Sequence, residues 1–129
     1  MTAAKKRFET SLEMARNGLL KADSPLWSVA WRNGWTVAHA AAVEGCIPTG
    51  FDLWGLPDRH GVTVAHIAAI FGNLPAGFDR WEMADYKGRT VAHAAAWGGK
   101  LPQGFGRMDL SDRSGMTVAD AVRRALPRK

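Results

Sequence analysis

The hydrophobic positions of this chain recur with a fixed period of 27 residues, and polar and turn-forming residues separate them. The phrase Thr-Val-Ala-His occurs three times, and a fourth copy ends in Asp instead of His. The four copies begin at Thr36, Thr63, Thr90 and Thr117. Each copy opens an apolar run, and no insertion changes the interval. A constant period of this length predicts structural units that stack with the same geometry.

Each apolar run has the start and stop signals of a short helix. The recurring threonine precedes the run, where its hydroxyl can accept a hydrogen bond from an unpaired N–H at the helix N-terminus. A glycine follows the run, and glycine suits the left-handed conformation that ends many helices. These glycines are Gly45, Gly72 and Gly99. The sequence therefore predicts one alanine-rich helix between each threonine and the next of these glycines.

The segment after each of these glycines predicts a second, brief helix. Pro48, Pro75 and Pro102 suit the first position of a helix, because proline lacks the N–H that would be unpaired there. Large aromatic residues follow the prolines at intervals of three, a helical spacing that favours an aromatic spine buried between neighbouring units. These aromatic residues are Phe51, Phe78, Phe105, Trp54 and Trp81.

Each unit closes on a turn with the pattern Asp-x-x-Gly. Aspartate at the first position and glycine at the fourth favour a type I β-turn, in which the carboxylate can accept turn N–H groups. The turn aspartates are Asp58, Asp85 and Asp112. Helix, helix and turn in every 27 residues predict an all-α fold, an α-solenoid of helix-helix-turn repeats.

We expect one domain over residues 1–129, divided by the repeat. The units are 34–60, 61–87, 88–114 and a C-terminal half unit, 115–129. The frame also extends backwards, because Trp27 lies 27 residues before Trp54. Residues 7–33 are therefore interpreted as a divergent N-terminal unit that caps the array.

The runs Asp58 to Pro75 and Asp85 to Pro102 resemble the ankyrin repeat. Ankyrin units carry Thr-Pro-Leu-His at the start of their first helix, and here Val and Ala replace Pro and Leu while Thr and His stay in place. An ankyrin unit has about 33 residues, so the resemblance implies ankyrin-like units with a shortened second helix and an altered curvature. The protein is similar to short-repeat, ankyrin-like modules of small bacterial and phage-type proteins.

The resemblance also assigns structural roles to the recurring polar residues. In ankyrin-like units the histidine hydrogen-bonds to the threonine three residues earlier, and the aspartate forms the turn. The structural residues are Thr36, His39, Thr63, His66, Thr90, His93, Asp58, Asp85 and Asp112. Asp120 replaces the histidine in the last unit, where its carboxylate can still cap or bond nearby.

The same resemblance places a binding surface on the concave side of the stack. The positions that face this side mix aromatic side chains with arginine, a composition favoured at binding hot spots. The partner-binding candidates are Trp35, Arg59, His60, Ile70, Phe71, Tyr86, Lys87, Arg89, Trp97 and Arg113. The alternative is that a shortened repeat buries some of them inside the groove.

Composition limits the class of protein. The 129-residue chain is 47% hydrophobic and 22% charged, as expected for one soluble globular unit. No apolar run reaches the roughly 18 residues needed to cross a bilayer, and the first residues lack the apolar stretch of a secretory signal, so we expect a cytoplasmic protein. Seventeen Lys and Arg against twelve Asp and Glu give a net charge of +5, which favours an acidic protein surface or a nucleic acid over a basic partner.

The periodic histidines and aspartates do not predict a catalytic or metal site. Stacked helices lie on the order of 10 Å apart, too far for two histidines to share a zinc ion at about 2 Å each. The single cysteine, Cys46, follows Gly45 near the predicted start of a second helix, a position that can lower a thiol pKa, but Asn73 and Lys100 are its equivalents. We therefore predict no catalytic residue, no metal site and no cofactor.

Two functions remain as hypotheses. The first is a non-catalytic protein-binding module that occludes or bridges a partner with an acidic or mixed surface; one concrete version inhibits a bacterial defence complex. The second is nucleic-acid binding, in which Arg59, Lys87, Arg89 and Arg113 on successive turns contact phosphates while Tyr86 or Trp97 stacks on bases. No membrane contact is expected in either case.

Overall fold

A computed structural model describes residues 3–125, and this part of the chain is all-helical. Its elements are α1 (Ala3–Arg16), the single-turn 3₁₀ helix η1 (Pro25–Ser28), α2 (Val37–Glu44), α3 (Val64–Phe71), α4 (Val91–Trp97) and α5 (Val118–Ala125). The predicted half unit 115–129 contains α5, but its residues 126–129 lie outside the described residues.

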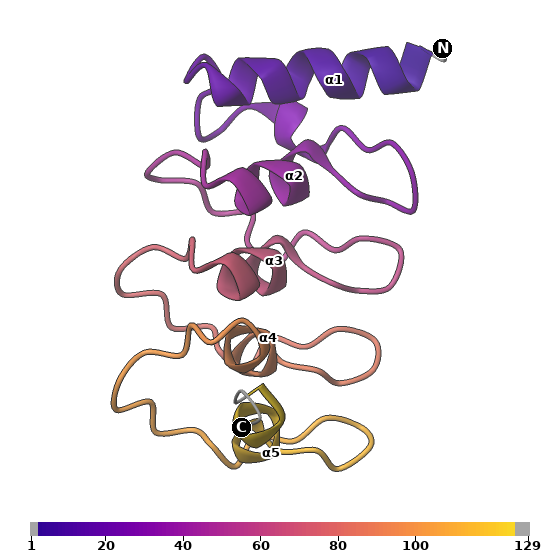
Figure 1. Cartoon of the computed structure of the whole chain (residues 1–129). Helices are drawn as coiled ribbons and strands as arrows, with labels where there is room; N and C mark the ends of the chain where they lie inside the picture. Colours follow the sequence, from indigo (N-terminus) through magenta and orange to yellow (C-terminus); the bar gives the residue numbers. More distant parts are fainter. Residues whose placement is uncertain (1–2, 126–129) are drawn as a thin grey trace.

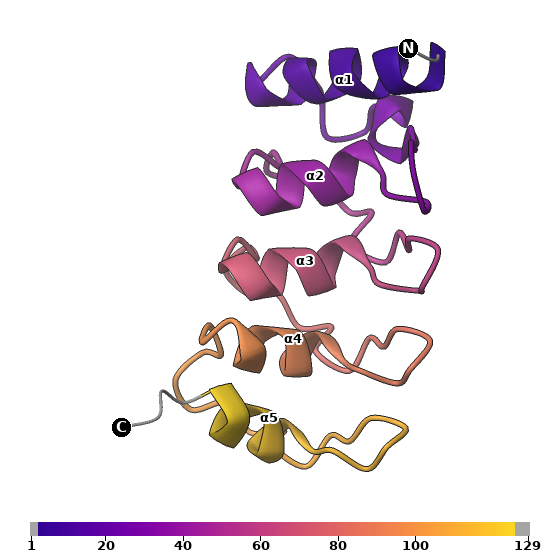
Figure 2. The same cartoon turned by 45° about the vertical axis from the view of Figure 1, so that its right-hand side comes forward.

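The α-helices pack against one another in chain order, each on the next. Figure 1 shows them as a stack with α1 at one end and α5 at the other, and the turned view in Figure 2 keeps the same order. Each connection between two successive helices from α2 to α5 has two parts. The part that follows one helix projects from one side of the stack, and the part that precedes the next helix projects from the other side (Figure 1). None of the helices described is long and apolar enough to cross a membrane.

The starts of α2, α3 and α4 and the ends of α2 and α3 agree with the signals in the sequence, whereas α4 is capped by Gly98 in the right-handed region, one residue before the predicted Gly99. Thr63 is the N-cap of α3, and its hydroxyl accepts a hydrogen bond from the N–H of His66 at 3.2 Å. Thr36 and Thr90 cap α2 and α4 in the same way. Gly72 ends α3 in the left-handed conformation, with φ +73°. The predicted alanine-rich helices are therefore confirmed.

The predicted second helix is wrong for the segments that follow α2, α3 and α4. After each short helix the structure has two successive turns instead: the N–H of Phe51 donates to the carbonyl of Pro48, and the N–H of Leu56 donates to that of Leu53. Gly50 lies between the two turns with φ +90°, a left-handed conformation that interrupts a right-handed helix. Units 34–60, 61–87 and 88–114 therefore each consist of one α-helix and a series of turns, whereas residues 7–33 contain part of α1 and the short helix η1.

The predicted aromatic spine is confirmed, although turns carry it rather than helices. Six rings form a continuous series, which we call the aromatic ladder: Trp27, Phe51, Trp54, Phe78, Trp81 and Phe105. Neighbouring ring centroids lie 5.1 to 6.0 Å apart in edge-to-face arrangements. Such pairs contribute about 0.5 to 1.5 kcal/mol each beyond the area they bury. The ladder therefore joins each unit to the next, from Trp27 in η1 along the loops that follow α2, α3 and α4.

Candidate functional site

Three buried histidines fix the spacing of the units. In α3 the Nδ1 atom of His66 accepts hydrogen bonds from the hydroxyl and the backbone N–H of Thr63, and its Nε2 atom lies 2.7 Å from the backbone oxygen of Arg89 in the next unit. A carbonyl can only accept, so Nε2 carries the proton and the ring is neutral. His39 and His93 make the same contacts with Val62 and Met116, at 2.8 Å.

The histidine contacts predict a loss of stability in mild acid. Burial lowers the pKa of His39 and His66 below the usual value of 6.5. Between that value and the lower native pKa, the unfolded chain binds protons that the native state does not. We expect the free energy of unfolding to fall as the pH drops from about 7 to 5.5, by up to about 1.4 kcal/mol per pH unit for each histidine. Urea unfolding at pH 7.5, 6.5 and 5.5 measures this slope.

The carboxylates act in a different pH window. Hydrogen bonding to Arg16 lowers the pKa of Glu44 below its usual 4.5, and hydrogen bonds from Ser114 lower that of Asp112 below 3.8. The stability they supply is present above those values and is lost only at lower pH.

Between pH 7.5 and 5.5 the slope of the free energy of unfolding against pH is therefore assigned to the histidines. A His66→Gln variant should have a smaller slope in this range, and an unchanged slope would contradict the assignment.

The Asp-x-x-Gly turns form a rigid row of tips beside the helices. Oδ1 of Asp85 accepts the N–H groups of Lys87 and Arg89 at 2.9 and 3.0 Å, and Oδ2 pairs with Nε of Arg89 at 2.7 Å. Asp58 and Asp112 bind their own turns in the same way through backbone N–H groups. Isolated β-bridges close the base of each turn, as between Ala84 and Thr90.

Backbone hydrogen bonds also join each tip to the next. The N–H of Arg59 donates to the carbonyl of Asn33 at 2.8 Å, that of Tyr86 to His60 at 3.2 Å, and that of Arg113 to Lys87 at 3.1 Å. These bonds fix the distance between side chains on successive tips, so residues on different units present a surface of constant shape.

The structure places the ten predicted partner-binding residues on the helices and these tips. Phe71, Tyr86 and Trp97 are exposed aromatic residues, with 49%, 61% and 38% of their surfaces accessible. Four tip residues are exposed: Arg59, His60, Lys87 and Arg113. Trp35, Ile70 and Arg89 are half-buried. We call this set of ten residues the candidate face.

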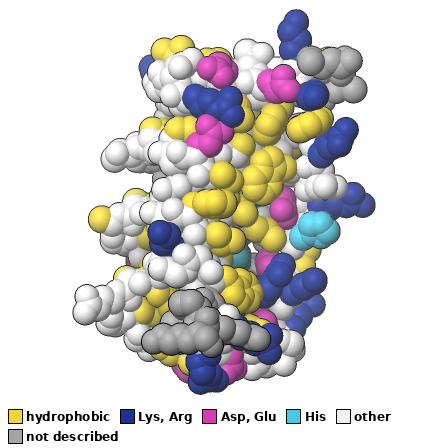
Figure 3. All heavy atoms as spheres, viewed as in Figure 1, with side chains coloured by type: hydrophobic (Ala, Val, Ile, Leu, Met, Phe, Trp, Pro, Cys, Tyr) yellow, Lys and Arg dark blue, Asp and Glu magenta, His cyan; other side chains and the backbone are white. Residues whose placement is uncertain are grey.

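Packing accounts for the half-buried members of the candidate face. The ring of Trp35 lies 5.0 Å from that of His39, and the guanidinium of Arg89 is held by Asp85. Figure 3 shows hydrophobic side chains gathered in a band along the stack, with Lys and Arg side chains along the side from which the tips project. This face of the molecule therefore has an apolar strip beside a cationic edge.

A hollow of about 300 Å³ opens between the tips of Asp58 and Asp85. It is lined by His60, Val62, Tyr86, Lys87 and Arg89. The ring of Tyr86 lies directly over Gly61, where an added Cβ would come within 2.5 Å of the ring. We call it the tip pocket. Four of its five residues were predicted as partner-binding residues, and the structure brings them together.

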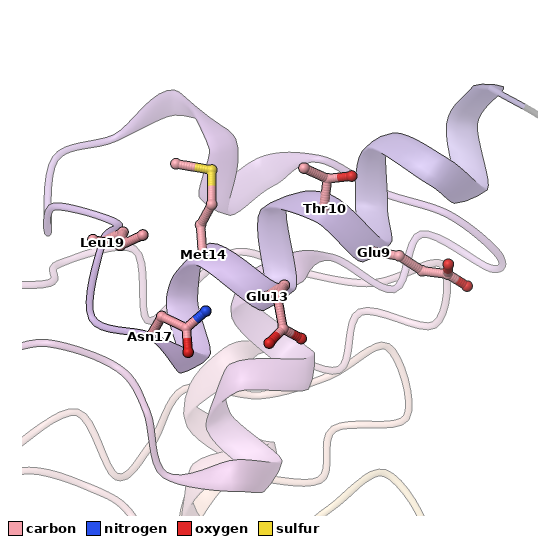
Figure 4. Close-up of a pocket in the computed structure, with 6 residues that line it drawn as sticks. All are labelled: Glu9, Thr10, Glu13, Met14, Asn17 and Leu19. Carbon is pink, nitrogen blue, oxygen red and sulfur yellow. The ribbon is translucent and has the colours of Figure 1, made fainter.

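A second hollow lies on the outer side of α1, at the end of the stack. It has a volume of about 370 Å³ and is lined by Glu9, Thr10, Glu13, Met14, Asn17 and Leu19. Figure 4 shows that Glu13 and Met14 point to different sides of α1 rather than toward one point. Glu13 is paired with Arg16 at 3.2 Å. This hollow therefore offers no convergent set of groups.

Cys46 does not have the environment of a reactive thiol. The sequence placed it near the start of a second helix, where its pKa would fall, but no helix begins there and burial raises the pKa instead. Its equivalent Asn73 has a structural role that the sequence did not reveal, because its side-chain N–H donates to the carbonyl of Ala42 at 2.8 Å and ties the end of α2 to the next unit.

Among residues 3–125, no group of three or more His, Cys, Asp or Glu is placed to hold a metal ion. Both ring nitrogens of each buried histidine are already in hydrogen bonds, so these side chains serve the stack. No protein-family model matches the chain, and a search of curated proteins finds no match either.

Proposed function

We propose that this protein is an ankyrin-like solenoid that binds another protein without catalysing a reaction. The observation that carries the proposal is the candidate face itself: exposed aromatic side chains at the ends of α3 and α4 and on the Asp85 tip belong to a stack whose tips carry exposed cationic residues. Aromatic residues and arginine are the side chains enriched at binding hot spots. The favoured partner has an acidic or mixed surface, because the chain has a net charge of +5.

The rigidity of the stack supports this proposal. Histidine contacts and tip-to-tip backbone bonds hold the helices and tips in one arrangement before any partner arrives. A preorganised surface loses less conformational entropy on binding, so more of the contact energy appears as affinity. Such a module acts by covering a site on its partner or by bridging two proteins. Inhibition of a bacterial defence complex is one form of this action that we propose for test.

The face is tested by replacing two exposed aromatic residues together. We expect Tyr86→Ala with Trp97→Ala to weaken capture of the partner by at least about tenfold, because hot-spot truncations typically cost 2 kcal/mol or more. The tagged protein and this variant are compared by affinity capture from a bacterial lysate, with and without nuclease, followed by mass spectrometry. Circular dichroism melting measures whether both fold.

Leu19→Ala is the matched control, because Leu19 is an exposed apolar residue in the loop after α1 (Figure 4). It should leave both capture and melting unchanged. Equal capture by the wild type and the double variant, with both folded, would remove the candidate face from the proposal. Unfolding of the double variant would instead assign Tyr86 and Trp97 to the core.

A second candidate function is nucleic-acid binding, favoured by the exposed row of Arg59, Lys87 and Arg113 on successive tips. The carboxylates of Asp58, Asp85 and Asp112 lie at the base of the same tips and oppose a polyanion. Salt dependence separates the two functions. Phosphate contacts give a slope of about −0.9 in log K against log salt for each phosphate neutralised on duplex DNA, whereas an apolar hot spot gives a shallow slope.

A further inference from the structure

We propose that the tip pocket receives one acidic side chain of a protein partner, and that an apolar residue two positions away in the partner packs on the end of α3. This inference rests on the proposed binding function and specifies its chemistry. The tip pocket is His60, Val62, Tyr86, Lys87 and Arg89.

The cationic groups of the pocket are available to a carboxylate. Lys87 is exposed and forms no ion pair within residues 3–125. Arg89 uses its Nε–H to bind Asp85 at 2.7 Å, and this contact orients the guanidinium while its terminal amino groups make no hydrogen bond within the described chain. Oriented N–H donors form strong, charge-assisted hydrogen bonds with a carboxylate.

The charge of the pocket favours a single negative charge. Lys87 and Arg89 supply two positive charges, and Asp85 removes one by pairing with Arg89. In the described part of the chain Lys87 is left as the lining cation without an ion pair, and its single positive charge matches a carboxylate, whereas a phosphate monoester carries about −1.5 to −2 at neutral pH. Val62 and the ring of Tyr86 add apolar walls that suit the methylene groups of a glutamate.

The other tips present different residues at the equivalent positions. The three positions that hold Tyr86, Lys87 and Arg89 hold Arg59, His60 and Val62 one unit earlier. One unit later they hold Arg113, Ser114 and Met116. Of these three tips, the Asp85 tip combines an exposed lysine with an arginine that the turn aspartate orients, so we expect an acidic residue of the partner to bind there and to set its register on the stack.

The position of the pocket beside α3 defines the second contact. His66 bonds to the backbone oxygen of Arg89, so the pocket adjoins the first turn of α3. Ile70 and the exposed Phe71 lie four and five residues after His66, which is a rise of about 6 to 8 Å along the axis of α3 at 1.5 Å per residue. In an extended peptide, residues i and i+2 lie on one side about 6.6 Å apart. An acidic residue and an apolar residue two positions apart therefore reach both places.

Short blocked peptides test this inference directly on the folded protein. The probes are acetyl-Glu-Ala-Phe-amide and its reverse, acetyl-Phe-Ala-Glu-amide, each with a matched peptide in which Gln replaces Glu. Binding is followed by chemical-shift changes in the ¹⁵N-labelled protein. We expect one Glu peptide to shift the amides of Lys87, Arg89 and Phe71 saturably, and its Gln counterpart to bind about tenfold more weakly.

Charge-matched variants complete the test. Lys87→Ala should reduce the affinity for the Glu peptide by about tenfold and leave that for the Gln peptide unchanged, whereas Lys6→Ala, an exposed lysine on α1, should change neither. Equal binding of the Glu and Gln peptides, no effect of Lys87→Ala, or shifts outside the pocket and α3 would overturn the inference. So would stronger competition by inorganic phosphate than by acetate, because that result would indicate a phosphate site.

Failure of this inference is distinguishable from failure of the proposed function. If neither Glu peptide binds preferentially but Tyr86→Ala with Trp97→Ala still abolishes capture of a protein, the pocket is not an acid receptor and the binding function remains. If the double variant captures the partner as the wild type does, the candidate face itself is rejected.

Discussion

Replacing Trp27 by alanine is expected to lower the free energy of unfolding by about 3 to 5 kcal/mol, the range for aromatic truncations in a core. Trp27 is 0% exposed and is the first ring of the aromatic ladder, 5.3 Å from Phe51. Its indole N–H also donates to the backbone oxygen of Lys21 at 2.8 Å, and the truncation leaves that acceptor without its partner. The whole free energy of unfolding of a typical domain is only about 5 to 15 kcal/mol.

Urea unfolding followed by tryptophan fluorescence and circular dichroism measures this loss. Trp97→Ala is the matched control, because it removes the same atoms from a side chain that is 38% exposed at the end of α4. We expect it to cost less than about 2 kcal/mol. Equal losses in the two variants would mean that the ladder does not carry the packing of the first unit.

This pair of variants also separates the aromatic residues that stabilise the fold from those proposed to contact a partner. The ladder rings lie in η1 and in the loops after α2, α3 and α4, where they join the units, whereas Phe71, Tyr86 and Trp97 leave much of their surface exposed to solvent. Aromatic residues used for folding and for contact are thus on different parts of the same repeat. Binding variants can therefore be made on the candidate face without emptying the core.

Local signals in the sequence were enough to locate the short helices. A threonine before an alanine-rich run and a glycine after it set both ends, because capping needs only residues that are neighbours in the chain. The same local signals predict the contact at the start of α5, where the carboxylate of Asp120 accepts a hydrogen bond from the backbone N–H of Thr117 at 3.1 Å. Each of these contacts spans only a few residues, so the pattern of residue types alone predicts it.

The second helix was predicted wrongly because one spacing fits two structures. Phe51 and Trp54 are three residues apart, which suits a helical face but also suits two consecutive turns. Gly50 and Gly77 adopt φ of +90° and +81°, and these values decide in favour of turns. The sequence shows that a glycine is present, but it does not show the sign of its φ.

The sequence predicts the aromatic spine between units, but it does not predict the hydrogen bonds that join one unit to the next. The resemblance gave the bond from His66 to Thr63, three residues away, but the bond from His66 to the carbonyl of Arg89 depends on how two units are stacked. The tip pocket is another such case, since its residues come from two tips. Its grouping follows from the backbone bond between Tyr86 and His60 rather than from any motif.

Gly98→Ala is expected to destabilise the stack by about 3 kcal/mol, at the upper end of the cost of overpacking. A Cβ at this position would lie 2.1 Å from the backbone oxygen of Ile70 and 2.8 Å from its carbonyl carbon. Because these are backbone atoms of α3, no rotamer change can relieve the clash, and α3 and α4 must move apart. The backbone at Gly98 has φ −82°, which alanine adopts without strain. The cost is therefore steric.

Thermal and urea unfolding of Gly98→Ala measure the effect, with Gly106→Ala as the control, because a Cβ at Gly106 meets nothing within 4 Å. The free energy of unfolding of the control should lie within about 0.5 kcal/mol of that of the wild type, as is usual for surface substitutions. The equivalent positions in α2 and α3 carry Glu44 and Phe71, so the close approach belongs to the α3–α4 pair. If Gly98→Ala is as stable as Gly106→Ala, these two helices are not packed as closely as the contact with Ile70 requires.

The separation between Phe71 and Trp97 on the candidate face depends on the same packing, so partner affinity should fall in Gly98→Ala even where the protein remains folded.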